Sequence, residues 1–197
     1  MPKPIGKNKE NFERTRSHLI AVATKCFAQY GYINSSTNMI IQQAKSSRGS
    51  LYNHFPHKSD LFKAVYDTLW EEMSKTLSQY PYKEKCLIQD LIDGCCAYMS
   101  QFTKQTFAQI ILIDAPHILG IDYCRSRDSE TAYKALHEGI LEITKKKDQA
   151  LLIADYLSGA LDTFALRIAT SQNRKTAYKK YATAFEEFTH KILEGYR

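Results

Sequence analysis

The chain has 197 residues, and its 44% hydrophobic and 24% charged content is ordinary for a folded globular protein that buries a sizeable core. The sequence has no uncharged apolar stretch of about 18 residues for a membrane span, no apolar secretory segment at its N-terminus, and no regular disulfide framework among its five cysteines. We therefore expect a cytoplasmic protein with no membrane partner and with reduced thiols.

The positive charge of the chain is concentrated near one end. The formal net charge is +6, but residues 1–63 hold 10 Lys/Arg and 3 Asp/Glu, whereas residues 64–197 hold 17 and 18. The first segment is therefore +7 and the second −1. This asymmetry indicates an N-terminal domain that binds a polyanion, joined to a nearly neutral body.

The first predicted element is a long helix that follows a basic tail. Residues 1–11 carry three lysines and two prolines but no apolar pattern, so we expect a mobile arm. This arm could touch DNA phosphates or a minor groove, or it could be a solvated tail. From Phe12 to Tyr30, apolar residues at helical spacing predict a helix, and Gly31 is a suitable C-terminal stop.

Two short helices around a tight turn are predicted next. Ser36 is a good N-cap for the first helix, and Lys45 interrupts its pattern. Ser47 is the second N-cap, and it begins a segment, Arg48–Phe55, that Pro56 ends. The second helix has few apolar and many hydrogen-bonding side chains, which is typical of the reading helix of a helix-turn-helix. The alternative is a helical hairpin inside a core.

This stretch resembles the DNA-binding domain of the TetR family of bacterial transcriptional regulators. The resemblance covers roughly residues 12–70 and rests on Gly31, Tyr32, Ser36, Ile40, Ala44, Ser47, Gly49, Leu51, Tyr52, His54, Phe55, Lys58 and Leu61. One departure is the turn, where the family often has Gly-Val and this chain has Lys45 and Ser46. A residue in such a turn can require a positive φ, which glycine adopts freely and lysine at modest cost.

The resemblance implies an all-α fold with two functional parts. It places a three-helix helix-turn-helix DNA-binding domain at residues 12–63, after the arm of residues 1–11, and a helical ligand-binding and dimerisation domain at residues 64–197. The implied function is that of a homodimeric repressor. Such a protein binds a palindromic operator in double-stranded DNA and is released from it by a small-molecule effector.

The resemblance also implies which residues contact DNA. Arg48 is the expected base reader, because a guanidinium can bond both guanine acceptors, and Ser50 and Asn53 add base contacts. Lys58 is expected to contact phosphate, with its side chain exposed in the free protein. The full set on matching positions is Ser36, Thr37, Arg48, Gly49, Ser50, Tyr52, Asn53, His54 and Lys58.

The rest of the chain is predicted to be helical with short breaks. A helix begins near Lys58 and ends before Tyr80, and the resemblance implies that it links the two domains and carries ligand-driven motion. Further helices are expected over residues 86–102, 105–113 and 123–144, with interruptions at 115–120 and near residues 127–128.

The last two predicted helices are the expected dimer interface. Residues 149–170 are apolar nearly all round, and residues 174–193 carry an aromatic stripe. Paired with their copies across a two-fold axis they would form a four-helix bundle, whereas the alternative is packing within one protomer. The predicted interface residues are Tyr156, Gly159, Ala160, Tyr181, Phe185 and Phe188.

An effector pocket is expected in the second domain because the resemblance implies one. Its predicted lining is Trp70, Tyr98, Phe102, Phe107, His117, Tyr123 and Phe164, although each of these residues could equally belong to a core. This aromatic set favours an apolar or aromatic effector only weakly. The adjacent Cys95 and Cys96 are predicted to be packing residues rather than a redox pair.

The sequence shows no catalytic set. His54 and His57 lack further ligands, so no metal or other cofactor is expected, and neither a Gly-rich phosphate loop nor a serine nucleophile motif is present. Asp114 near His117 is better explained as a buried polar pair or a ligand contact. Two other classes stay open: a helical scaffold or ligand-binding protein with a silent helix-turn-helix, and a helical enzyme. Salt-dependent, sequence-selective DNA binding would exclude the first.

Overall fold

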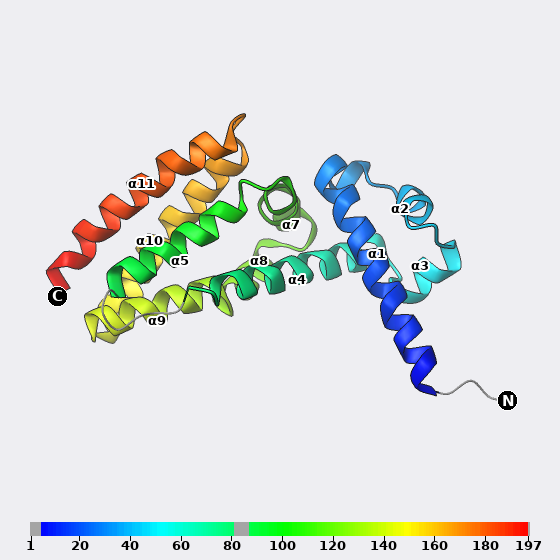
Figure 1. Ribbon diagram of the computed structural model, residues 1–197, viewed down its shortest axis with the longest axis horizontal. Coiled ribbons are helices and arrows are strands. Elements are labelled where there is room, and N and C mark those ends of the chain that lie inside the picture. The colour runs from blue at the N-terminus through cyan, green and yellow to red at the C-terminus, as the bar shows by residue number, and fades with distance from the viewer. Residues whose placement is uncertain (1–4, 81–86, 197) are drawn as a thin grey trace.

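The structure, a computed structural model, describes residues 5–80 and 87–196. All regular elements in these residues are helical, which confirms the predicted fold class, and they form two bodies connected by a long helix (Figure 1). The elements are α1 (Ile5–Asn34), α2 (Thr37–Gln43), α3 (Arg48–His54), α4 (Lys58–Leu77), α5 (Leu87–Gln101), α6 (Gln105–Phe107), the π-helix η1 (Ala108–Asp114), α7 (Ala115–Ile118), α8 (Ile121–Ser129), α9 (Ala132–Thr144), α10 (Lys147–Ala169), α11 (Arg174–Leu193) and the 3-10 turn η2 (Glu194–Tyr196).

The N-terminal body packs α1, α2, α3 and the first half of α4 around one apolar core. Ile40 of α2 and Leu51 of α3 are fully buried, so each short helix has an anchor in this core. The ring of Phe62 on α4 lies 5.2 Å from that of Phe27 and 5.1 Å from that of Tyr32, both pairs edge to face. Aromatic pairs of this kind contribute about 0.5–1.5 kcal/mol beyond the area they bury.

Helix α1 differs from its prediction at its N-terminal end. It begins at Ile5 rather than at Phe12, so the prediction of a mobile arm is wrong for residues 5–11, whereas residues 1–4 lie outside the described part of the chain. Polar residues can extend a helix that is already nucleated, because each added residue gains one hydrogen bond. At the other end Gly31 breaks the helix with φ 73° and ψ 169°, as its predicted role as a stop requires.

The two bodies are joined by more than the continuous helix α4. Where α1 ends, the N–H of Tyr32 donates to the carboxylate of Asp114, at the end of η1, over 2.8 Å. The side-chain amide of Gln105 on α6 donates to the carbonyl of Ala28 on α1 over 3.2 Å. Helix α1 therefore lies directly against α6 and η1 of the second body.

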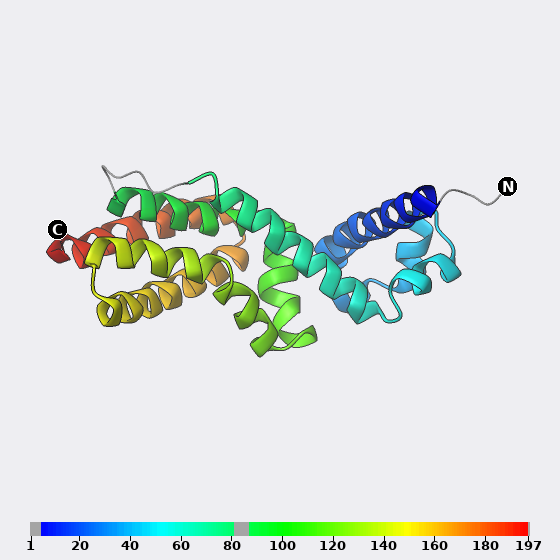
Figure 2. The same ribbon diagram turned by 90° about the horizontal axis from the view of Figure 1, so that it is seen from below.

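The C-terminal body is a bundle in which α5, α9, α10 and α11 pack on one another, with α8 beside α4 (Figure 2). Helix α10 turns a face of small and aliphatic residues inward, including Ala154, Leu157 and Ala165. Helices α8 and α9 are separated by a turn at residues 130–131, so the break that the sequence placed near residues 127–128 lies a few residues further along the chain. None of the described helices is long and apolar enough to cross a membrane.

Candidate nucleic-acid interface and internal cavity

The helix caps and the turn of the α2–α3 pair are formed by the residues that the sequence predicted. The hydroxyl of Ser36 accepts from the N–H of Met39, and that of Ser47 accepts from the N–H of Ser50, each over 3.1 Å. Both serines therefore cap their helices as expected. Lys45 sits in the turn with a φ of 47°, the left-handed conformation that glycine would favour there.

Helix α3 presents a polar face to solvent. Arg48, Gly49, Tyr52 and Asn53 are exposed, whereas Leu51 on the opposite face is buried. The guanidinium of Arg48 lies 5.5 Å from the centre of the Tyr52 ring. The Tyr52 hydroxyl is in turn 3.4 Å from the hydroxyl of Thr37 on α2. Of the predicted DNA-contacting residues, Arg48, Tyr52 and Thr37 are therefore joined by side-chain contacts, and the cap Ser36 is exposed next to Thr37 in the chain.

Two other predicted DNA-contacting residues turn inward. The ring of His54 lies 4.0 Å from that of Phe12 on α1, and its buried Nδ1 has no hydrogen-bond partner among residues 5–80 and 87–196. The ammonium of Lys58 donates to the backbone carbonyls of Tyr32 and Ile33 and lies 4.1 Å from the centre of the Tyr32 ring. The expectation that Lys58 is exposed in the free protein is therefore wrong.

Lys58 is drawn inward because α1 ends close to the start of α4. Beyond the break at Gly31, the Lys58 ammonium donates to the carbonyls of Tyr32 and Ile33, and the Tyr32 carbonyl also accepts from the N–H of Ser35 over 3.3 Å. Burial lowers the pKa of this ammonium, and the nearby Asp114 carboxylate opposes the shift. The sequence carries no signal for this contact, because residues 32 and 58 meet only in the folded chain.

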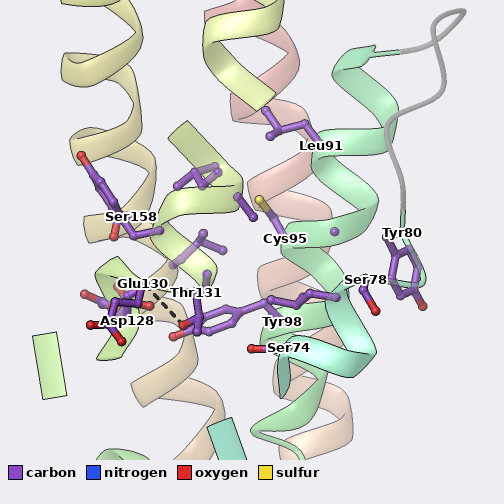
Figure 3. Close-up of a pocket in the computed structure, with 18 of the residues that line it drawn as sticks. Ser74, Ser78, Tyr80, Leu91, Cys95, Tyr98, Asp128, Glu130, Thr131 and Ser158 are labelled. Carbon is purple, nitrogen blue, oxygen red and sulfur yellow. Dashed lines mark hydrogen bonds between the residues drawn. The ribbon is translucent and has the colours of Figure 1, made fainter. Parts of the chain in front are cut away.

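The second body contains a cavity of about 390 Å³. Side chains from α4, α5, α9 and α10, and from α8 with the turn that follows it, line this cavity (Figure 3). Its apolar lining includes Leu77, Leu91, Cys95, Leu136 and Leu161. Its polar lining includes Ser74, Ser78, Tyr80, Asp90, Tyr98, Asp128, Glu130, Thr131, Tyr133, Ser158 and Asp162.

Of the seven residues predicted for the pocket, Tyr98 alone is in the described lining. The other six residues do not line this cavity, so the predicted lining stays a prediction that this cavity does not support. Trp70, Phe102 and Phe107 are buried in the core. His117 is exposed on α7, Tyr123 bonds to α4, and Phe164 packs on Tyr181. Large apolar rings fill space between helices, and a cavity is left where smaller and polar side chains meet.

A cluster of ion pairs centred on Asp67 of α4 connects α4 to α8. The Asp67 carboxylate accepts from the hydroxyl of Tyr123 over 2.6 Å and lies 2.9 Å from the ammonium of Lys63 and 3.4 Å from the guanidinium of Arg127. Arg127 also lies 3.2 Å from the carboxylate of Glu130, which lines the cavity. A short chain of side chains thus runs from the cavity to the helix that enters the N-terminal body.

The cavity carries negative charge on two facing elements. Burial and the carboxylate of Asp162 raise the pKa of Asp128 to about 7. Burial also raises the pKa of Asp162, against the lowering effect of Arg125. Among the described residues, no Lys or Arg nitrogen lies within ion-pair distance of either carboxylate. Neither residue could be predicted from the sequence, because the two lie far apart in the chain.

The thiols near the cavity have the chemistry expected of packing residues. Cys95 is buried and Cys96 half-buried, and burial is the main cause that raises the pKa of both thiols, that of Cys96 to about 11. The thiolate is the reactive form, so both residues are mainly protonated and unreactive at neutral pH.

The outer faces of α10 and α11 carry apolar side chains in solvent. Leu152 is 69% exposed, Tyr156 66% and Phe188 53%, although all three are large hydrophobic residues. Of the other predicted interface residues, Gly159 is exposed, and Ala160 and Tyr181 are partly buried. Phe185 is 2% exposed, so it packs inside the protomer and its placement in an interface is wrong.

Two family models match the chain. The first, described as bacterial regulatory proteins of the tetR family, matches residues 19–65. The second, described as the tetracyclin repressor-like C-terminal domain, matches residues 88–192, which are 105 of the 197 residues. The two matched ranges lie in the two bodies of the fold.

Individual curated proteins are similar to this chain over a part of its length. The HTH-type transcriptional regulator AcrR of Shigella flexneri is 32% identical over 77 residues, which are 39% of this chain and 36% of that protein. The uncharacterised HTH-type transcriptional regulator YhgD of Bacillus subtilis is 32% identical over 57 residues, which are 29% of this chain and 30% of that protein. The chain thus matches about a third of the length of these relatives.

Solved structures extend the similarity to both bodies. A TetR-family transcriptional regulator from Pectobacterium atrosepticum superposes with a TM-score of 0.77 at 26% identity, over 93% of this chain and 96% of that one. GusR of Salmonella enterica superposes with a TM-score of 0.70 over 92% and 96%, and at 18% identity it shows the fold alone. These families consist of regulators rather than enzymes, and with a family model matching more than half of its residues the chain belongs to the tetR family of bacterial regulatory proteins.

Proposed function

We propose that the chain is a DNA-binding transcriptional repressor that acts as a homodimer in the cytoplasm and is released from its operator by a small molecule. The observation that carries this proposal is the exposed face of α3. Arg48, Tyr52 and Asn53 point to solvent while Leu51 anchors the helix in the core. This face lies in the segment of the chain that holds the excess positive charge.

The proposed mode of binding places α3 in a DNA major groove. Arg48 then reads a guanine, because its guanidinium can bond both acceptors on the base edge, and its position over the Tyr52 ring restricts its conformations before binding. Ser36 and Thr37 at the start of α2 face the phosphate backbone. A homodimer presents two such helices, so the operator is expected to be a palindrome.

The proposed dimer uses the exposed faces of α10 and α11. Leu152, Tyr156 and Gly159 lie four and three residues apart, so they form one stripe on α10, and Phe188 lies on the exposed side of α11. Exposed apolar stripes of this kind mark interaction surfaces. The two helices and their copies across a two-fold axis would bury this stripe in a four-helix bundle.

The proposed effector occupies the cavity of the second body. This cavity has a size suited to a small organic molecule, and the Asp67 cluster links its wall to α4. An effector that moves α8 would therefore shift α4 and, with it, the two reading helices. The structure of RolR was determined with resorcinol bound, and its fold matches this chain with a TM-score of 0.63 at 16% identity.

The test is to select genomic fragments that bind the protein and to measure affinity for the selected site and for random DNA across a salt series. The expected result is sequence-selective, salt-dependent binding. Arg48→Ala should weaken the selected site by about 1–3 kcal/mol per half-site and relax preference at one base pair. Lys25→Ala, which removes an exposed charge from α1, is the matched control. Equal affinity for all sequences would instead favour a scaffold with a silent helix-turn-helix.

A further inference from the structure

The described lining of the cavity carries acidic groups and no basic group. Asp90, Asp128, Glu130 and Asp162 all contribute to it, whereas no Lys, Arg or His does so among the described residues. Arg127 neutralises the carboxylate of Glu130 from outside this lining. Asp128 and Asp162 both add negative charge to the cavity, and neither has an ion-pair partner in the part of the chain that the structure describes.

Separate elements bring these two carboxylates to the same cavity. Asp128 belongs to the end of α8 and Asp162 to the middle of α10, and both residues line the cavity. Partial removal from water raises the pKa of both groups, and the Asp162 carboxylate raises that of Asp128 further, whereas Arg125 opposes the shift at Asp162. Two neighbouring carboxylates are costly in such a place, and a cation between them would relieve the cost.

The rest of the lining suits the body of an organic cation rather than a bare metal ion. Leu91, Cys95, Leu136 and Leu161 supply an apolar floor, and the ring of Tyr98, itself 7% exposed, forms part of the wall (Figure 3). The face of a tyrosine ring attracts a positive charge. No group of three or more potential metal ligands occurs among the described residues.

We propose that the effector of this protein is an organic cation of modest size, whose positive group lies between Asp128 and Asp162 and whose apolar part rests on the leucine side chains of α5, α9 and α10. This inference rests on the proposed function, because it assigns a chemical class to the effector of the proposed repressor. It changes the expectation from the sequence, which gave only weak support to an apolar or aromatic compound.

The experiment compares three probes of nearly equal shape on the full-length protein. Naphthalene-2-carboxamidine is a cation, naphthalene-2-carboxamide is neutral and naphthalene-2-carboxylate is an anion. Calorimetry at pH 8, where Asp128 is mostly ionised, should show that the amidine binds at least about tenfold more tightly than the amide, and that the carboxylate does not bind. Equal binding of the amide, tighter binding of the carboxylate, or no binding of the amidine at millimolar concentration would overturn the inference.

Variants test whether the two carboxylates cause the preference for the amidine over the amide. Asp128→Asn combined with Asp162→Asn keeps the shape of both side chains and should reduce the affinity ratio of amidine to amide to about one. Glu71→Gln removes an exposed carboxylate from α4, outside the cavity, and should leave the ratio unchanged. A double variant that folds, as judged by its circular dichroism, and keeps the full preference for the amidine would refute the assignment.

Operator binding by the protein without a probe separates this inference from the proposed function. If the protein binds no DNA selectively but prefers the amidine, the proposed function fails and the cation site stands. If the protein binds its operator and a neutral or anionic compound releases it through this cavity, the repressor stands and the cation inference fails.

Discussion

Replacing Lys58 by methionine should destabilise the protein, because the Lys58 ammonium holds the end of α1. In the native state it donates to the carbonyls of Tyr32 and Ile33 and lies over the Tyr32 ring. Methionine retains most of the apolar length of the side chain but has no donor. The two carbonyls would then lose this partner at the point where Gly31 has already ended the helix.

The magnitude follows from two opposing contributions. A hydrogen bond from a charged group contributes about 1.5–3 kcal/mol and a cation–π contact about 0.5–1 kcal/mol. Partial burial of the ammonium, which also lowers its pKa, reduces this gain. We therefore expect a net loss of about 1–2 kcal/mol, which for a chain of this length corresponds to a fall in Tm of roughly 2–8 °C.

The assay is thermal unfolding of the Lys58→Met protein at a fixed protomer concentration, with Lys25→Met as the matched control. Lys25 is exposed on α1, so its variant should melt within about 1 °C of the wild type. If Lys58→Met melted with the wild type but lost DNA affinity and salt dependence, the side chain would be a phosphate contact. That result would refute the role in the fold that the structure gives it.

Three other perturbations test different parts of the structure. Gly31→Ala should lower the free energy of unfolding by about 1–3 kcal/mol in urea titrations, because φ 73° with ψ 169° is a conformation essentially restricted to glycine; unchanged stability would contradict this. Phe188→Glu should convert the dimer to a folded monomer in sedimentation experiments, whereas Phe185→Glu should unfold the protomer because Phe185 is buried; a folded Phe188→Glu dimer would place the interface elsewhere. Asp128 binds its proton more tightly in the folded state, so its contribution to stability is present at low pH and lost as pH rises from about 4 to about 7. Asp128→Asn should remove that loss and be more stable at pH 8 by about 1–3 kcal/mol, and melting curves of both proteins over this pH range should diverge as pH rises; parallel curves would show that the carboxyl is not perturbed.

The helix-turn-helix could be predicted from the sequence because its signals are local. A serine at an N-cap bonds to a backbone N–H three residues later, and Ser36 and Ser47 both do so. Gly31 and Lys45 have the positive φ that their positions suggested. The alternation of a buried Leu51 with exposed neighbours follows from helical periodicity alone. Helices and their caps depend on residues within one turn of each other, so a single sequence is enough to predict them.

The direction of long side chains could not be predicted in the same way. Lys58 and Phe185 both have sequence positions compatible with an exposed role, and both turn inward. The residues that these two side chains contact lie on other elements. Whether each side chain faces water or packs against a distant carbonyl or the core therefore depends on how the helices cross. A periodic pattern identifies the apolar side of a helix. It does not show whether an apolar residue on that helix packs into the core of its own protomer or faces solvent.

The cavity is the feature that only the tertiary structure decided. The sequence indicated aromatic residues for it, yet rings such as Phe102 and Phe107 fill the core. A cavity forms where the packed helices leave volume unfilled, and its chemistry is set by the side chains that border this volume. Asp128 and Asp162 are 34 positions apart on different helices, so their electrostatic interaction exists only once α8 and α10 border the same space.

Local composition determined the helices and the basic N-terminal domain, because propensity, capping and charge are properties of neighbouring residues. The arrangement of helices determined the acidic site, because electrostatic coupling depends on distance in space.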